Sequence, residues 1–355
     1  MYMLTYYQVM PAFLDFVFPF GLQEHAQDFY FSGFREETHL LPAESSLRIP
    51  EIGRSGRNIC MCFSLKGIER SDAQSWPWSM RQTSAYHSFD VEAGRALWIL
   101  VKGNEVIEER IQSATSPDRL SKNGILNKPS RVLRTTFETH LILCEWSAEN
   151  WRWYMNYLEG VLQDITSRSL AIKIGKNPKA AAEETYQFTT ARTLSTIQRG
   201  GQEFQSLGPP VSTPPLSRVP SYHPTNPQQL GPPPPPKVLP PGRGKPSQEK
   251  DRKTDELEGF SFHDLQQVQL IEEKMSEVLL VLDSNTHVLT EMNGYYDSVV
   301  KLDEWPEELA DACKPDVARF SKRIVSTIKE LRMHHARAKT MLRLLKERKT
   351  LVCFN

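Results

Sequence analysis

The sequence lacks the long apolar segment that a membrane-spanning helix requires. Its strongest apolar run near the start, Met10–Phe20, is about half of the ~20 residues needed to cross a bilayer, and Asp15 and two prolines interrupt it. A helix buried in a protein core explains this run better. We therefore expect no transmembrane span in the chain as given and a cytoplasmic location, or a membrane location if a longer protein supplies C-terminal spans.

Cysteine is scarce and poorly spaced for metal or disulfide chemistry. There is no CxxC pair, and no histidine stands at zinc-finger spacing from any of the five cysteines, Cys60, Cys62, Cys144, Cys313 and Cys353. The sequence also contains no Asn-x-Ser/Thr sequon and no signal peptide. Together these absences favour a reducing compartment.

Signatures of catalysis and of nucleotide binding are absent as well. No GxSxG turn and no convincing Cys–His pair offers a nucleophile. Gly53–Arg57 and Gly242–Lys245 lack the GxGxxG spacing and the strand-to-helix setting of a phosphate-binding loop. His334 and His335 cannot share a ligand, because adjacent helical positions point about 100° apart, so one is expected in a helix seam and the other at the surface. We predict no catalytic, cofactor-binding or metal-ligating residue, and hence no enzyme.

Net charge is absent overall but strong locally. The 43 Lys and Arg residues balance the 43 Asp and Glu residues, so no attraction to nucleic acid is expected. Residues 261–311 contain twelve acidic side chains and two basic ones, Lys274 and Lys301, whereas residues 314–355 contain twelve basic and three acidic ones. We predict an acidic helix packed on a basic helix, with charge pairs between the two selecting their register.

Residues 1–172 are predicted to form a mixed α/β or α+β domain. Asn58–Leu65 is a short apolar run between glycine-containing segments, which is typical of a buried strand, and Cys60 and Cys62 would share one side of it. Ser79–Val91 and Ala96–Val101, joined by a glycine-containing loop, predict a β-hairpin.

Helices are expected to complete this domain. We predict them at Val106–Gln112 and Arg131–Glu145, and a third that begins with Ser147 as its N-cap. One buried face of the third helix is marked by aromatic and aliphatic residues at helical spacing, Trp151, Tyr154, Leu158, Val161, Leu162 and Ile165.

Residues 173–258 are predicted to be a disordered linker. Fifteen of the 25 prolines lie between Pro209 and Pro246, and such a composition cannot bury enough apolar surface to offset the entropy of ordering. Pro232–Lys237 satisfies a loose PxxPx(+) pattern in polyproline II, which suits an SH3- or WW-type partner. A stiff spacer is the simpler interpretation of the same run.

Residues 259–355 are predicted to form a long antiparallel two-helix stalk, similar to a coiled coil. Apolar residues step by threes and fours through a first helix of about 38 residues: Leu265, Val268, Ile271, Met275, Leu279, Leu282, Leu289, Met292, Tyr296 and Val299, with a skip at Thr286. Trp305–Pro306 ends this helix or begins a short acidic turn, and Pro315 suits the first position of the second helix. The second seam continues through Val317, Phe320, Ile324, Ile328, Leu331, His335, Ala338, Leu342 and Leu345.

Two charged segments of the stalk leave alternatives open. The carboxylates at the bend, Asp303, Glu304, Glu307, Glu308 and Asp311, could coordinate a hard cation, but no glycine-punctuated loop organises them, and a solvated acidic tip is the simpler interpretation. Arg343–Lys349 is compatible with contact to anionic membrane lipid.

Several segments resemble the fungal CorA-like transporter-domain proteins. They cover most of the regions expected to be ordered, and are Tyr6–Phe18, Tyr86–Val91, Ala96–Asn104, Glu149–Tyr154 and the C-terminal run from Ala318–Phe320 to Leu344–Leu351. The resemblance implies a cytosolic α/β domain that continues into a helical stalk. In CorA relatives this stalk leads into two membrane helices, forms a pentamer and serves the transport of magnesium or related divalent cations.

The sequence departs from that family at the pore. The Gly-Met-Asn signature is absent, since Met292-Asn293-Gly294 has the wrong order, and the two membrane helices are missing. We therefore expect a truncated or soluble relative that does not conduct ions alone and acts through self-association or association with full-length relatives along the Val317–Leu345 seam. The alternative is a soluble adaptor that uses the helical hairpin and the polyproline segment.

Overall fold

The computed structural model describes residues 2–21, 31–41, 47–72, 76–116, 128–171 and 262–353. Met1–Ser169 and Phe260–Asn355 form one compact unit. The linker predicted at 173–258, with its Pro232–Lys237 segment, lies outside the described residues, so its disorder stays a prediction. The two predicted regions at the ends of the chain share one hydrophobic core.

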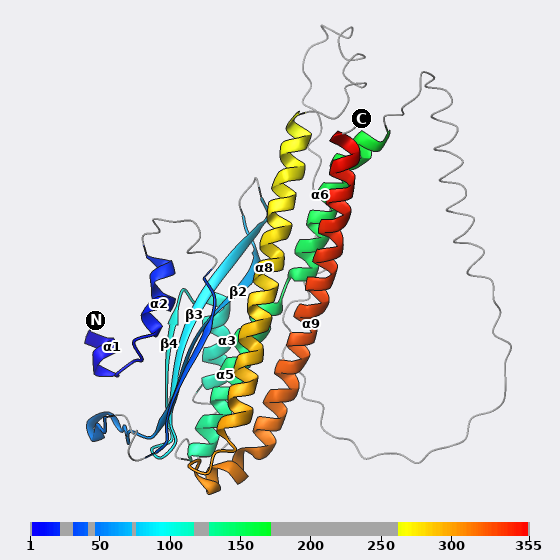
Figure 1. The fold of residues 1–355 in the computed structure, drawn as a ribbon. Helices are drawn as coiled ribbons and strands as arrows, with labels where there is room; N and C mark the ends of the chain where they lie inside the picture. Colours follow the sequence, from blue (N-terminus) through cyan, green and yellow to red (C-terminus); the bar gives the residue numbers. More distant parts are fainter. Residues whose placement is uncertain are drawn as a thin grey trace, which may run out of the picture. The chain divides into compact units, whose positions relative to one another are not determined.

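A four-stranded antiparallel sheet lies at the centre of the first unit (Figure 1). Its order is β1 (Phe34–His39), β2 (Asn58–Arg70), β3 (Trp78–Asp90) and β4 (Arg95–Val101). The expected strand at 58–65 runs on to Arg70, because Lys66 and Gly67 pair with Gln82 and Arg81 of β3. Gly67 is needed here, since a Cβ atom at this position would lie 3.0 Å from the Trp146 indole.

The predicted hairpin is confirmed as β3 and β4. Their antiparallel register runs from Ser84–Val101 to Asp90–Arg95. Gly94 closes the turn with a φ of 62° and donates its N–H to Asp90 O at 2.9 Å. A side chain at Gly94 would meet Pro129 at 2.8 Å, so both the backbone conformation and the space require glycine.

The two faces of β2 enter different hydrophobic clusters. Ile59, Met61, Phe63 and Leu65 belong to the large cluster with the long helices. Cys60 and Cys62 face the other way and are buried, as predicted, against Tyr86 and two phenylalanines of α2 (Phe13–Val17), Phe13 and Phe16. The apolar run Met10–Phe20 thus becomes α2 and a 3-10 turn, η1 (Phe18–Phe20), which cover one sheet face.

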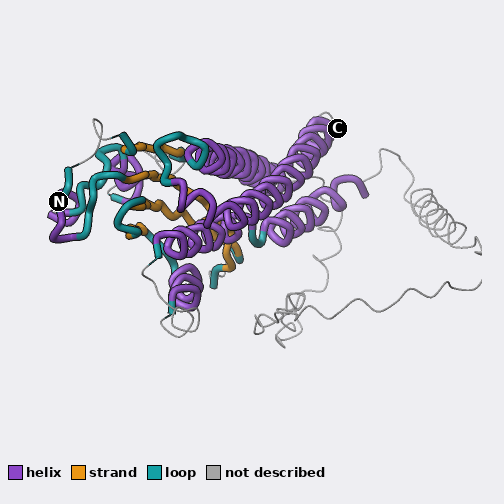
Figure 2. Tube along the Cα trace, turned by 90° about the horizontal axis from the view of Figure 1, so that it is seen from below, coloured by secondary structure: helices purple, strands orange, loops and turns teal. Residues whose placement is uncertain are grey.

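Long helices cover the opposite face of the sheet (Figures 1 and 2). Within the described residues, the helical elements of the unit are α1 (Tyr2–Tyr6), η3 (Pro50–Ile52), α3 (Glu105–Thr115), α5 (Pro129–Ala148), α6 (Trp151–Ala171), α8 (Phe262–Val299) and α9 (Glu307–Cys353), besides α2 and η1. The helices expected at 106–112 and 131–145 are confirmed as α3 and α5. The structure places α9 beside both α8 and α5, so the stalk packs on a third helix.

The prediction that Ser147 caps a helix is wrong. Ser147 is the penultimate residue of α5, and its hydroxyl donates to Cys144 O at 2.7 Å instead of binding a free N–H group. The break comes three residues later, where Asn150 adopts a φ of 66°. Asparagine tolerates this left-handed conformation, which ends one helix and lets α6 begin at Trp151.

The first stalk helix has the predicted length of 38 residues but a wider buried surface. Most of the expected stripe is buried, and so are Val278, Val281 and Val288, which fall outside it. The reason is that α8 contacts β2 and β1 on one side and α9 on the other. A sequence pattern that assumes one neighbouring helix underestimates the buried surface of a helix that lies between two layers.

The second stalk helix begins earlier than Pro315 predicted. It starts at Glu307, where Leu309 and Ala310 donate their N–H groups to Pro306 O, and Pro315 lies inside it. An interior proline costs about 3 kcal/mol. Burial of Leu309 and Cys313 before it keeps the first turns helical despite that cost.

One of the two adjacent histidines is buried, but it is not the predicted one. His334 is 6% exposed, whereas His335, the predicted seam residue, is only partly buried. The buried face of α9 is wider than the predicted seam toward α8, because this helix also contacts α5 and α6.

Candidate functional site

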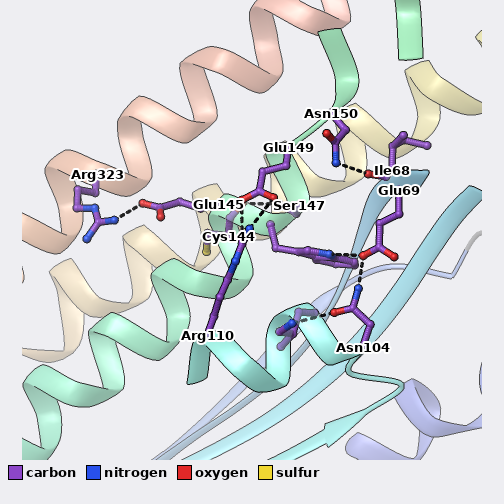
Figure 3. A network of polar contacts seen from close by, with 12 residues as sticks. Ile68, Glu69, Asn104, Arg110, Cys144, Glu145, Ser147, Glu149, Asn150 and Arg323 are labelled. Atoms are coloured by element: carbon purple, nitrogen blue, oxygen red, sulfur yellow. Dashed lines mark hydrogen bonds and ion pairs between the residues drawn. The ribbon is translucent and has the colours of Figure 1, made fainter. Parts of the chain in front are cut away.

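A polar network joins the sheet to three helices near the end of β2 (Figure 3). Glu69 Oε1 accepts hydrogen bonds from Trp146 Nε1 at 2.9 Å and from Asn104 Nδ2, and Glu69 Oε2 lies 3.6 Å from Arg81 Nε. Asn104 also caps α3, because its Oδ1 accepts from Ile107 N at 2.9 Å. One carboxylate thereby fixes the ends of β2 and β3, the start of α3 and the last turn of α5.

A second part of the network holds the α5–α6 break. Arg110 of α3 donates two hydrogen bonds to Glu149, at 2.6 and 3.0 Å, and this contact raises the pKa of Arg110. Glu145 accepts from Arg323 of α9. The break is therefore held between α3 and α9 (Figure 3).

Side-chain amides complete the open edge of β2. β1 pairs with β2 only as far as Phe63, and Ser64 N still donates to Gly33 O at 3.2 Å, so the outward backbone groups of Lys66 and Ile68 lie beyond the reach of β1. Asn285 of α8 accepts from Lys66 N at 3.1 Å and donates to Lys66 O at 2.7 Å, as a neighbouring strand would. Asn150 donates to Ile68 O at 2.9 Å. These two asparagines satisfy groups that would otherwise be buried without partners.

A buried histidine links the sheet to the helices. The His140 ring of α5 lies against rings from β2, β3, β4, α8 and α9, namely Phe63, His87, Trp98, Tyr296 and Phe320. Its Nε2 lies 3.0 Å from the Tyr296 hydroxyl, and His87 Nε2 lies 3.4 Å from Thr136 Oγ1. The Nδ1 atoms of both histidines are buried without a hydrogen-bond partner.

Burial keeps these histidines neutral. Desolvation lowers the pKa of His87 to about 3, and it lowers the pKa of His140 well below its usual range, with a smaller effect from His87. Both rings are fully buried, so no solvent-borne substrate reaches them. This geometry supports a packing role at the sheet–helix interface.

Buried thiols and an amine on the other sheet face do not form a nucleophilic site either. Desolvation raises the pKa of the Cys60 thiol and raises that of Cys62 to about 12, so both stay protonated. Burial lowers the pKa of Lys66 to about 8, and its Nζ donates to Phe31 O at 2.8 Å.

The glycine-containing segment at 53–57 is a structural turn. Gly53 has a φ of 66°, and the Arg95 guanidinium occupies the space that a Cβ would fill. Ser55 donates its N–H and its hydroxyl to the Asp90 carboxylate, at 2.7 and 2.8 Å. The segment therefore joins β3 instead of binding phosphate, and 242–245 lies outside the described residues.

The acidic residues at the α8–α9 bend do not converge on a metal. Within the described part of the chain, no group of three or more His, Cys, Asp or Glu side chains is placed to hold a metal ion. The bend is instead attached to the sheet, because Arg57 donates to Glu304 O at 2.9 Å and to Leu40 O at 3.1 Å. Trp305 is buried beside this contact.

The charge pairing predicted between the stalk helices is accompanied by pairs with other helices. Lys349 Nζ of α9 does lie 2.8 Å from Glu272 Oε2 of α8. Two arginines of α9, however, pair with helices outside the stalk: Arg323 with Glu145 of α5, and Arg337 with Glu159 of α6 at 2.9 Å. Acidic side chains of α5 and α6 thus contribute to the electrostatic register of α9, together with the pair to α8.

The residues that organise this interface left weak signals in the sequence. Asn285 stands beside the skip at Thr286 in the apolar stripe of α8, and that interruption could have indicated a buried polar contact. Glu69 and His140 follow no recognisable spacing. None of the described helices combines the length and the apolar character that crossing a bilayer demands.

Comparison with known proteins relates the first part of the chain to a family of transporters. Residues 1–170 match a family model described as CorA-like transporters. These residues contain the sheet, α2, α3 and α5 and nearly all of α6. No curated protein and no solved structure shows a significant match to the chain.

Proposed function

We propose that the chain is a non-enzymatic regulatory or structural unit of the CorA-like, divalent-cation type, with magnesium as the expected ion. It acts by associating with itself or with full-length relatives, and these relatives carry out transport. The match of residues 1–170 to CorA-like transporters is the observation on which this proposal depends. The packing of α8 and α9 onto α5 and β2 in the same unit supports it, because a stalk held this way moves together with the sheet.

The surface proposed for association is the solvent face of the stalk. The seam residues Phe320, Ile324 and Leu331 are buried inside the chain, so a partner has to contact exposed groups. On α9, exposed basic side chains recur at helical spacing, namely Lys322, Lys329, Arg332, Lys339, Arg343 and Lys346. On α8, the exposed face carries acidic side chains, Glu273, Asp283 and Glu291. Complementary faces on two helices favour a head-to-tail contact between copies.

Sedimentation velocity with and without millimolar magnesium tests the proposal. We expect an oligomer whose population changes with magnesium and falls as salt rises, because exposed charge contacts are screened. A chain that stays monomeric, with the same unfolding midpoint in both buffers, would contradict it.

Charge reversal tests the proposed surface. Arg332→Glu with Lys339→Glu on α9 should dissociate the oligomer, and so should Glu273→Lys with Asp283→Lys on α8. Combining the four changes in one chain should restore association, because opposite charges meet again. Failure of this rescue, with all variants folded, would place the contact elsewhere.

The second candidate is an interaction adaptor, favoured by the Pro232–Lys237 pattern in the sequence. Deleting residues 209–246 separates the two functions. An adaptor would lose binding to SH3- or WW-type domains, whereas the proposed stalk unit would keep its assembly.

A further inference from the structure

A hollow of about 460 Å³ lies where β4 ends, and its size falls in the range of small-molecule sites. Its walls come from η1, the ends of β2 and β3, the loop from β4 to α3, and Trp146 of α5. The Glu69 network holds three of these walls together through Trp146, Asn104 and Arg81. The site is therefore built from fixed elements.

The open edge of β3 supplies backbone groups to this hollow. β4 pairs with β3 only from Ser84 onward, so the first part of β3 extends past its neighbour. Lys66 and Ile68 of β2 direct their backbone groups away from β3, and their register partners are Gln82 and Met80. In an antiparallel pair these partners also point outward, so the N–H groups of Met80 and Gln82 face the side that β4 has left. Both residues line the hollow.

Two cations stand at its mouth. Arg81 is half exposed and contacts Glu69 only through Nε at 3.6 Å, which leaves its terminal nitrogens available. Lys102 is exposed and has a φ of 60°, an unfavourable conformation for lysine, and it lies directly before Gly103 in the same wall. Strained residues of this kind cluster at ligand-binding loops. Two positive side chains and one carboxylate leave the lining with a net positive charge.

We propose that this hollow binds a small organic oxyanion, a phosphate ester or carboxylate with an apolar body. The oxyanion lies between Arg81 and Lys102 and accepts hydrogen bonds from the β3 edge. Its apolar part packs on Met80, Pro19 and Phe20, which line the same space. This inference is independent of the association proposed above, because the site is formed by residues of β2, β3, the loop from β4 to α3, η1 and α5.

Calorimetric titration of the full chain with phenyl phosphate tests the proposal. We expect saturable one-to-one binding, about tenfold weaker in Arg81→Gln and about fivefold weaker in Lys102→Gly. Glycine suits the φ of 60° at position 102, so this variant removes the ammonium without straining the fold. Arg131→Ala, which removes an exposed arginine outside the hollow, should bind within about twofold of the parent chain.

Further probes identify the group recognised. Stronger binding of phenyl phosphate than of benzoate assigns a phosphate ester, and the reverse assigns a carboxylate. Binding of inorganic phosphate alone, with no gain from the phenyl group, would overturn the apolar half of the proposal. Absence of saturation by about 10 mM, or equal affinity in the parent, Arg81→Gln and Lys102→Gly chains, would overturn the whole.

Discussion

The two faces of the sheet are covered in different ways. On one face, α5 and α8 bury large aromatic and aliphatic side chains, and His140 touches rings from five other elements. On the other, short α2 and η1 cover Cys60, Cys62 and Tyr86, and polar Lys66 lies buried further along β2. Most of the stability should therefore come from the helical face, while the α2 face is the one able to open locally.

The largest expected effect is a loss of unfolding free energy when one phenylalanine on each face is truncated to alanine. Phe320→Ala removes a ring of α9 that stacks on Phe137 at 4.9 Å, and should cost about 3–5 kcal/mol of unfolding free energy. Phe13→Ala in α2 should cost less, about 1–3 kcal/mol, because α2 can detach without unfolding the rest. Urea denaturation measures both losses. Equal losses, with no faster amide exchange around α2 in Phe13→Ala, would contradict the difference between the faces.

A smaller loss is expected from the amide that completes β2. Asn285→Ala removes the side-chain partner of the buried N–H and C=O of Lys66, which should cost about 2–4 kcal/mol. Asn293→Ala in the same helix is the matched control, since the Oδ1 of Asn293 has no hydrogen-bond partner. Denaturant midpoints of the two variants compare them. Similar values would mean that Asn285 does not replace a strand.

The effect expected within one pH unit is smaller, and acidification measures it. The pKa of His87 falls from 6.5 to about 3 on folding, so the unfolded chain binds more protons between these values. The unfolding free energy should therefore decline as pH drops below 6.5, by up to about 1.4 kcal/mol per pH unit for each such histidine. His87→Gln should flatten this slope. A slope unchanged in His87→Gln would show that His87 does not titrate as its burial requires.

Lys66 gives the corresponding response on the other face. Its pKa falls from 10.5 to about 8 on folding, so the unfolded chain again binds more protons between these values. Its contribution to the unfolding free energy should then rise with pH through that interval. Lys66→Met removes this alkaline response while leaving the acidic one intact.

The sequence predicted elements whose signals are local. The hairpin of β3 and β4 follows from two β-rich runs around Gly94, and the 38 residues of α8 follow from an apolar period. Charge patterning did not predict the ion pairs between distant parts of the sequence. Arg337 finds Glu159 of α6, which nothing in the stalk sequence indicates, because the partner is 178 positions away.

The candidate sites could not be derived in the same way. The hollow beside β4 exists because β3 is longer than its neighbour, a property of register that composition does not contain. In the sequence, only the skip in the apolar stripe at the neighbouring Thr286 indicated Asn285, since the partners of Asn285 are backbone groups of Lys66. Serine is a common N-cap residue, but Ser147 lies inside α5, and the helix ends where Asn150 adopts a φ of 66°.

The two asparagines that bind the edge of β2 have a consequence for the behaviour of the protein at high concentration. An exposed strand edge can pair with another chain and start the growth of fibrils. Here Asn285 of α8 and Asn150 of the α5–α6 break bind the backbone of that edge, so another strand should not add there while α8 remains docked. Loss of the α8 contact would expose the most apolar strand of the molecule, and deposition should then track undocking of α8.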